Sequence, residues 1–247
     1  MSGQVLESLH DVVSAEHPTY IGGGTDIMPL LKNEVRDDKD FVFLKKIPEL
    51  HVLEEKDGEL IIGATMTLTE LAESELLNSR YAAIAQAASL TASPQIRNIA
   101  TVGGNIMQDR RCIYFNQPHL WRSGLACHEH LPILVTRFFV PAAEEGERSG
   151  FYKYAMRTTI DFPIINFALR CGGKRPARLA AGAVAPHPVV MAETAAKIDS
   201  GATDDEVIAQ AEDELRKLAM PIKEACMTPA VKRSLYRHVA MLLDLRK

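Results

Sequence analysis

The sequence predicts an α+β fold in which a small β-α-β lobe and a second, mixed α/β lobe are followed by strands and a C-terminal helical lobe. Strand-like apolar runs alternate with helical periodicity up to residue 184. Beyond Pro186 and Pro188 the pattern is mainly helical to the end of the chain. With 247 residues, the chain is long enough for two or three small domains. We expect three: residues 1–50, 51–145 and 146–247.

The first predicted lobe alternates helices and strands around a run of glycines. Residues 3–15 carry apolar side chains three and four positions apart, which predicts an amphipathic helix. A short strand at 19–21 leads into Gly22-Gly23-Gly24, and a helix follows that a small polar residue can cap. A buried strand is expected at 41–44.

The second predicted lobe begins with a β-hairpin. Its expected elements are strands at 50–54 and 59–64, a helix that Thr67 or Thr69 begins, and an alanine-rich helix at 80–91. Between the strands lies Asp57-Gly58, a dipeptide that suits a type I′ turn because both residues tolerate positive φ. A long stretch without periodicity then follows from residue 109 to 131, and such stretches inside a domain are usually functional.

The last part is predicted to change from strands to helices. The expected elements are strands at 133–140, 151–157, 164–170 and 178–184, then helices at 189–198, 203–218 and 229–245. The acidic turn at 143–147 is expected to be a solvated hairpin tip. Thr203 and Glu206 have the spacing of a capping box, which marks the start of a helix.

Bulk composition is that of a globular protein and excludes several function classes. Apolar residues make up 47% and charged residues 24% of the chain. The net charge of −4 gives no reason to expect nucleic acid, and no apolar run approaches the length of a membrane span. The N-terminus lacks a secretory signal pattern, and four widely spaced cysteines do not form a disulfide framework. We therefore expect a cytoplasmic protein.

Two glycine loops are the main candidates for ligand binding. One follows the strand at 19–21 and contains Gly22-Gly23-Gly24; the other contains Gly103-Gly104. Glycine has no Cβ and accepts positive φ, so its backbone N–H groups can approach an anion closely. Neither loop is a dinucleotide fingerprint or a P-loop, and each alone could be a tight structural turn. Together they favour one phosphorylated cofactor held by both loops.

Other polar candidates have structural alternatives of similar weight. Asp109 could bind a cofactor hydroxyl or pair with a neighbouring arginine. Lys153 could meet a flavin carbonyl or a phosphate, or be a solvated strand lysine. No nucleophile–base or paired-carboxylate grouping is visible, so we predict no catalytic residue, and redox chemistry would need a bound cofactor. One group suggests metal binding but lacks a standard spacing, which favours a structural role: Cys112, Cys127, His128 and His130.

Three segments together resemble the FAD-binding medium subunits of molybdenum hydroxylases. They are 22–32, 96–105 and 153–163, the last with the pattern Lys-x-x-x-Arg-x-x-x-Asp. The resemblance implies a two-lobed FAD-binding fold in which backbone N–H groups of both glycine loops hold the pyrophosphate, Asp109 a cofactor hydroxyl and Lys153 the polar edge of the flavin. The residues implied to bind FAD are Tyr20, Ile21, Gly22, Gly23, Gly24, Thr25, Asp26, Ile27, Thr101, Val102, Gly103, Gly104, Asn105, Asp109 and Lys153.

The same resemblance implies a role and partners. The flavoprotein subunit of 4-hydroxybenzoyl-CoA reductase is the most similar branch, although only Cys112 and Cys127 match the four ligands of its extra 4Fe-4S cluster, so we do not predict that cluster. The implied function is electron transfer between 2Fe-2S clusters of a small subunit and an external acceptor or donor such as NAD, in a complex with a molybdopterin-binding large subunit. An assembly subunit that kept the fold but lost FAD is the alternative. A stand-alone flavin oxidase or reductase is disfavoured because no substrate acid–base pair is visible.

Overall fold

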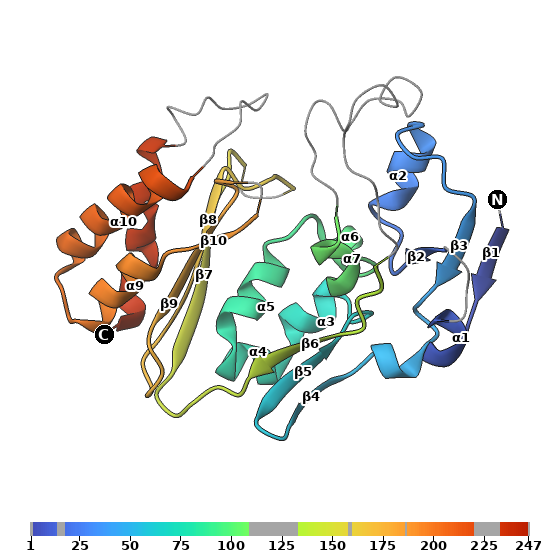
Figure 1. Cartoon of the computed structure of the whole chain (residues 1–247), viewed down its shortest axis with the longest axis horizontal. Coiled ribbons are helices and arrows are strands. Elements are labelled where there is room, and N and C mark those ends of the chain that lie inside the picture. The colour runs from blue at the N-terminus through green and yellow to red at the C-terminus, as the bar shows by residue number, and fades with distance from the viewer. Residues whose placement is uncertain are drawn as a thin grey trace. The chain divides into compact units, whose positions relative to one another are not determined.

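The computed structural model describes residues 2–13, 18–108, 133–157, 160–185, 187–219 and 233–246. The chain divides into two compact units, one formed by Met1–Glu70 and Pro94–Ala142 and the other by Leu71–Ser93 and Ala143–Lys247. Figure 1 shows the mixture of sheets and helices. The predicted α+β class is confirmed, whereas the three-part division at residues 50 and 145 stays a prediction.

A small parallel sheet begins the first unit. Its strands are β1 (Ser2–Val5), β3 (Asp40–Phe43) and β2 (Thr19–Ile21), paired in the order β1-β3-β2. The helices α1 (Leu9–Val13) and α2 (Ile27–Lys32) connect them. Val12, Val42, Leu44, Ile47 and Leu50 form the buried cluster of this region.

The predicted helix over residues 3–15 is wrong at its beginning. Residues 2–5 form strand β1, in parallel register with β3 so that Gly3 lies opposite Phe41. Val5 is 58% exposed and does not belong to the apolar face of a helix, whereas Val12 is fully buried. The apolar spacing was real, but the helix it predicted is formed only from Leu9, and Leu6, Leu9 and Val12 are the side chains that pack on the core.

An antiparallel sheet completes the regular structure of the first unit. Its order is β4-β5-β6, with β4 at Leu53–Lys56, β5 at Glu59–Gly63 and β6 at Arg137–Pro141. The predicted β4–β5 hairpin is confirmed: Asp57 has φ 52° and Gly58 φ 81°, as a type I′ turn requires. The strand expected from residue 133 begins only at Arg137. Four short elements lie next to these strands along the chain. One precedes β4, η1 (Pro48–Leu50), and three lie between β5 and β6: α3 (Leu68–Glu73), α6 (Pro94–Arg97) and α7 (Val102–Ile106).

The second unit is built on an antiparallel sheet of order β10-β9-β8-β7 (Figure 1). Its strands are β7 (Arg148–Tyr154), β8 (Ile165–Cys171), β9 (Arg178–Gly182) and β10 (Val189–Val190). The buried side chains of β8 alternate along the strand and share one core with the helices α9 (Ala192–Asp199), α10 (Asp204–Leu218) and η2 (Tyr236–Arg246). The predicted capping box at the start of α10 is present, since Thr203 N–H donates to Glu206 Oε2 and Glu206 N–H to Thr203 Oγ1.

Strand β7 is protected on its outer edge by a helix. Two helices, α4 (Glu75–Arg80) and α5 (Ala82–Ser89), precede it in this unit. Phe151 N–H donates to Gln86 Oε1 at 2.7 Å, and Ala83 N–H donates to Ser149 Oγ at 3.2 Å. Because an unpaired strand edge invites association with other strands, this side-chain pairing caps part of the edge that β8 leaves open.

Two boundaries in this unit differ from those expected. Residues 189–190 pair with β9 as strand β10, so the helix predicted from residue 189 begins at Ala192. The last predicted helix, 229–245, is described only from residue 233 and is mainly a 3-10 helix over Tyr236–Arg246.

The helix η2 is attached to the sheet by Tyr152 Oη, which lies 3.0 Å from His238 Nδ1. Burial lowers the pKa of His238, with the charge of Arg237 adding to this, so the neutral ring is favoured beside the tyrosine.

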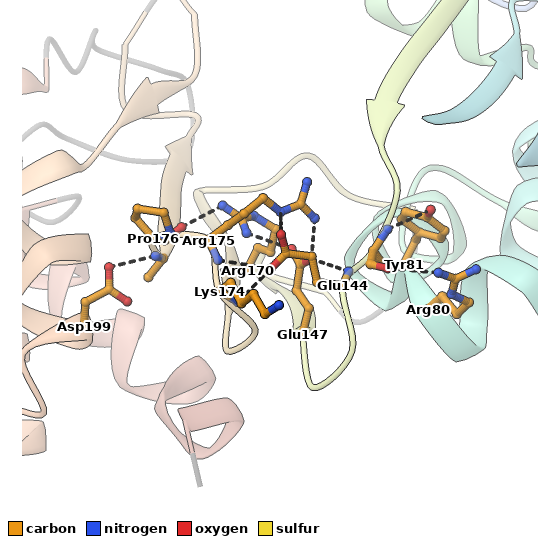
Figure 2. A network of polar contacts seen from close by, with 11 residues as sticks. Arg80, Tyr81, Glu144, Glu147, Arg170, Lys174, Arg175, Pro176 and Asp199 are labelled. Atoms are coloured by element: carbon orange, nitrogen blue, oxygen red, sulfur yellow. Dashed lines mark hydrogen bonds and ion pairs between the residues drawn. The ribbon is translucent and has the colours of Figure 1, made fainter. Parts of the chain in front are cut away.

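The expectation that residues 143–147 form a solvated hairpin tip is wrong. The strands before and after this turn, β6 and β7, belong to different sheets. The side chain of Glu147 is only 4% exposed and binds the guanidinium groups of Arg170, at 2.8 Å, and Arg175. Glu144 accepts hydrogen bonds from the N–H groups of Lys174 and Arg175 (Figure 2). Two glutamates of an apparently solvated run therefore hold the turn between β8 and β9.

Candidate functional site

The first glycine loop presents backbone N–H groups that have no protein partner. It follows β2, contains Gly24 with φ 71°, and leads into α2. Within the described ranges, no protein acceptor takes the backbone N–H groups of Gly22, Gly23, Gly24 or Thr25. Successive N–H groups around a residue with positive φ form a concave donor array, the arrangement that binds anions. Ile21 is buried, so any contact it makes to a ligand comes from its backbone.

The second glycine loop uses its N–H groups differently. Thr101 is the N-cap of α7, and its Oγ1 accepts the N–H of Gly104 at 3.2 Å. Val102 N–H donates to Met66 O and Gly103 N–H to Ala64 O, both at 2.9 Å, while Asn105 N–H donates to Thr101 O. Since all four N–H groups have protein acceptors, this loop is fixed in place before any ligand arrives. The N–H of Thr101 is not among these four, and the predicted role of the loop in holding the pyrophosphate stays a prediction.

The two loops lie directly against each other. A Cβ at Gly23 would be 2.1 Å from the carbonyl oxygen of Ile99, and one at Gly22 would be 2.3 Å from Thr101 Oγ1. A Cβ at Gly103 would be 2.8 Å from that of Ala64. A side chain at any of these three glycines would therefore clash: at Gly23 with backbone, at Gly22 with the Thr101 side chain and at Gly103 with Ala64. The structure brings together the two loops that the sequence paired, 20–27 and 101–105.

Gly104 is the exception among these glycines. It is exposed, and among the described residues outside its own helix backbone a Cβ there would meet only Thr101 Oγ1, at 3.1 Å. Large apolar side chains around the loops are also exposed: Met28, Ile99, Ile106 and Met107. An exposed glycine beside free N–H donors and apolar side chains fits a ligand that has an anionic part and a planar apolar part, as FAD has.

Lys153 lies on β7 in the second unit, and its ammonium group has partners there. Nζ donates to Leu90 O at 2.8 Å and to Asp161 O at 2.6 Å. The alternative of a fully solvated strand lysine is therefore wrong. The carboxylate of Asp161 in turn accepts from the N–H groups of Arg157 and Phe162, so Lys153 and Asp161 together shape this loop. Burial opposes ionisation of Asp161, but these hydrogen bonds and the charge of Arg157 outweigh it and lower its pKa.

The remaining predicted residues lie outside the described part of the chain. This applies to Asp109 and to the group Cys112, Cys127, His128 and His130. Within the described ranges, no cluster of three or more His, Cys, Asp or Glu side chains could hold a metal ion. No helix in those ranges combines the length and apolar character that a membrane crossing requires.

Sequence reasoning missed a polar group beneath the second loop. Thr67 and Glu70 form a capping box at the start of α3: Glu70 Oε2 accepts from Thr67 N–H at 2.7 Å and from Thr67 Oγ1 at 2.6 Å, and Glu70 N–H donates to Thr67 Oγ1. His51 Nε2 lies 3.1 Å from Glu70 Oε1. The T-x-x-E spacing of Thr67-Leu-Thr-Glu70 was a signal that could have identified it. It also resolves which threonine begins the helix, Thr67 and not Thr69.

Comparison with known proteins decides the family. The family described as the FAD binding domain in molybdopterin dehydrogenase matches residues 3–143, and the CO dehydrogenase flavoprotein C-terminal domain matches residues 150–242. The chain belongs to the FAD-binding medium subunits of the molybdenum hydroxylases. The xanthine dehydrogenase FAD-binding subunit of Escherichia coli is 32% identical to this flavoprotein in an alignment of 197 positions that covers 68% of each chain.

Solved structures agree in fold. A chain of the carbon monoxide dehydrogenase of Hydrogenophaga pseudoflava superimposes with a TM-score of 0.79, covering 96% of this flavoprotein and 93% of that chain at 20% identity. A chain of quinoline 2-oxidoreductase from Pseudomonas putida gives 0.78, covering 99% and 95% at 18% identity. Both glycine loops fall in the matched FAD-binding domain, and Lys153 falls in the matched C-terminal domain. Similarity to the 4-hydroxybenzoyl-CoA reductase branch stays a prediction.

Proposed function

We propose that this flavoprotein is an electron-transfer subunit of a cytoplasmic molybdenum hydroxylase complex. It would exchange electrons between 2Fe-2S clusters on a small subunit and an external acceptor or donor such as NAD, while a large subunit carries the molybdopterin cofactor and the substrate. Its own residues then have the tasks of binding and orienting FAD, and no catalytic residue is required. The bound flavin supplies the redox chemistry.

The observation that carries this proposal is the array of unpartnered N–H groups in the first loop. Gly22, Gly23, Gly24 and Thr25 would donate to the pyrophosphate of FAD, with Gly24 setting the concave shape through its positive φ. The second loop would support them, because Gly23 rests on the backbone of Ile99 and Ala100. The pyrophosphate contacts are therefore assigned mainly to residues 20–27, and Gly104 leaves room for the cofactor.

Lys153 and Asp109 are assigned supporting roles. Lys153 would place the loop that holds Asp161, and any contact of its ammonium group with the polar edge of the flavin would add to the two carbonyl hydrogen bonds it already makes. Asp109 would accept a hydrogen bond from a cofactor hydroxyl, since carboxylates accept from ribose and ribityl groups. Both assignments rest on the family motif.

The proposal predicts that the complex contains FAD. When the full chain is purified with the subunits that accompany it, the complex should show flavin absorbance and release stoichiometric FAD on denaturation. Phosphodiesterase treatment of the released flavin, which raises FAD fluorescence by converting it to FMN, identifies the dinucleotide. A well-folded, active complex that releases no FAD on denaturation would contradict the proposal and support the alternative, an assembly subunit that has lost FAD.

A further inference from the structure

The capping box at Thr67 and Glu70 is connected to the second glycine loop by the backbone. Thr67 forms an antiparallel bridge with Thr101, the N-cap residue of α7. On one side of this bridge Leu68 N–H donates to Ala100 O at 3.0 Å, and on the other Val102 N–H donates to Met66 O at 2.9 Å. The segment before α3 therefore holds the second loop along its length.

The carboxylate of Glu70 also binds this segment, through Thr67. One oxygen accepts both hydrogen bonds from Thr67, and the other contacts His51. Burial opposes ionisation of Glu70, but the hydrogen bonds from Thr67 and the contact with His51 outweigh it and lower its pKa, so the carboxylate is the form that binds. The Thr67 side chain is nearly buried, with 8% of the residue exposed, and the carboxylate satisfies its hydroxyl donor.

The same chain of contacts reaches the first loop. Gly23 packs so closely on Ile99 and Ala100 that a methyl group does not fit between them. A displacement of residues 99–101 would consequently move the donor array at Gly22–Thr25. Glu70 and His51 are absent from both loops, yet they set the position of the segment on which both loops rest.

We propose that Glu70, supported by His51, is a positioning residue for the pyrophosphate site of FAD. It acts through Thr67 and the second loop and touches no cofactor atom. The proposal rests on the proposed function for its link to FAD. Its structural half, that Glu70 holds residues 99–104 in place, stands independently of any ligand.

The test compares three single variants of the full chain in the complex in which it purifies. Glu70→Ala removes the acceptor, Glu70→Gln keeps an oxygen that can accept from Thr67, and Glu73→Ala is the matched control because Glu73 is an exposed carboxylate on the same helix. Two quantities are measured: amide hydrogen exchange of a peptide covering residues 98–106, and the dissociation constant of FAD after the flavin has been removed and titrated back.

Glu70→Ala should raise the exchange of Val102 and Gly103 and weaken FAD binding, each by about tenfold, since a hydrogen-bonded partner of a nearly buried hydroxyl is lost. Glu70→Gln should keep most of the parent's protection from exchange and most of its FAD affinity. Glu73→Ala should change neither the exchange nor the FAD affinity. The melting temperature of the complex should stay near that of the parent, which separates a local displacement from general loss of structure. His51→Ala, with an effect of about twofold in the same direction, provides the second variant if Glu70→Ala does not fold.

The outcomes distinguish the two proposals. If Glu70→Ala folds, keeps parental exchange at residues 98–106 and binds FAD as the parent does, the positioning role is wrong. If His51→Ala and Glu70→Gln also leave the exchange of residues 98–106 and the dissociation constant of FAD unchanged, the positioning role is wrong for both Glu70 and His51. If the parent itself binds no FAD, the proposed function fails, while the exchange measurement still decides whether Glu70 positions the loop.

Discussion

A Gly104→Leu variant is expected to lose FAD affinity by about a hundredfold or more while keeping its fold. Gly104 is exposed, and among the described residues outside its own helix backbone the only atom near a Cβ at this position is Thr101 Oγ1. Inside the helix α7, leucine is favoured over glycine by up to about 1 kcal/mol, which offsets a small adjustment of Thr101. The added side chain would instead occupy the space beside the free N–H groups of the first loop. Calorimetric titration with FAD and thermal unfolding measure the two effects separately.

Two further variants make this prediction specific. Glu59→Leu adds the same side chain at an exposed position in the same unit and should leave FAD binding unchanged. Gly23→Ala places a methyl group 2.1 Å from a carbonyl oxygen, so it should lower stability as well as FAD affinity. If Gly104→Leu binds FAD with parental affinity, the cofactor does not approach the second loop, and the proposed site would have to be moved.

Glu147→Ala is expected to lower the free energy of unfolding by about 2–3 kcal/mol. The side chain of Glu147 is 4% exposed and receives two guanidinium groups, so its removal leaves Arg170 and Arg175 without their shared carboxylate. Both arginines are more than a quarter exposed, and water can recover part of the loss, which is why the effect stays below that of a fully buried pair. Denaturant unfolding of the full chain measures it.

The matched control is Glu145→Ala, since Glu145 is an exposed carboxylate in the same turn. It should change stability by less than about 0.5 kcal/mol. Equal effects of the two substitutions would mean that the contacts of Glu147 shown in Figure 2 contribute nothing beyond a surface charge.

The stabilisation by Glu147 should also depend on pH in a defined direction. Burial raises the pKa of this carboxyl, but the hydrogen bond from Glu144 N–H and the contacts of Arg175 and Arg170 outweigh it, and the pKa is lowered on folding. The contribution is therefore complete above the unfolded pKa, about 4.3, and disappears as the pH falls through the lower folded value. The difference in stability between parent and Glu147→Ala should be constant above about pH 5 and shrink in more acidic solution.

Local signals in the sequence predicted local structure well. The turn at Asp57-Gly58 and the capping box at Thr203 and Glu206 are both found, because each depends on residues only a few positions apart. The pairing of the two glycine loops was also predicted, although its geometry was not. Sequence patterns do not reveal which N–H groups a distant segment will occupy, and those of the second loop are taken by residues 64–66 and by Thr101 itself.

The errors share a different cause. Strand β1 depends on pairing with residues about forty positions away, so the helical spacing in its sequence gave the wrong prediction. The acidic run at 143–147 looked like a solvated turn because the partners of Glu147, Arg170 and Arg175, lie 23 and 28 positions further along the chain. In both places a long-range contact determined the structure against the local preference. Composition and periodicity do not predict such contacts.

The interleaving of the two units constrains how the polypeptide can be synthesised and dissected. Residues 71–93 interrupt the first unit, whose later part follows them in the chain. Helix α5 in this insertion contacts β7 through the Gln86 side chain and the Ala83 N–H. Neither unit is therefore a continuous stretch of polypeptide. During translation the first unit lacks a complete chain until residue 142 has left the ribosome. Strand β7, which α5 contacts, is synthesised later still. A truncated gene ending between β6 and β7 would release α5 without its partner, so proteolytic or genetic separation of the two halves should yield aggregating fragments rather than autonomous domains.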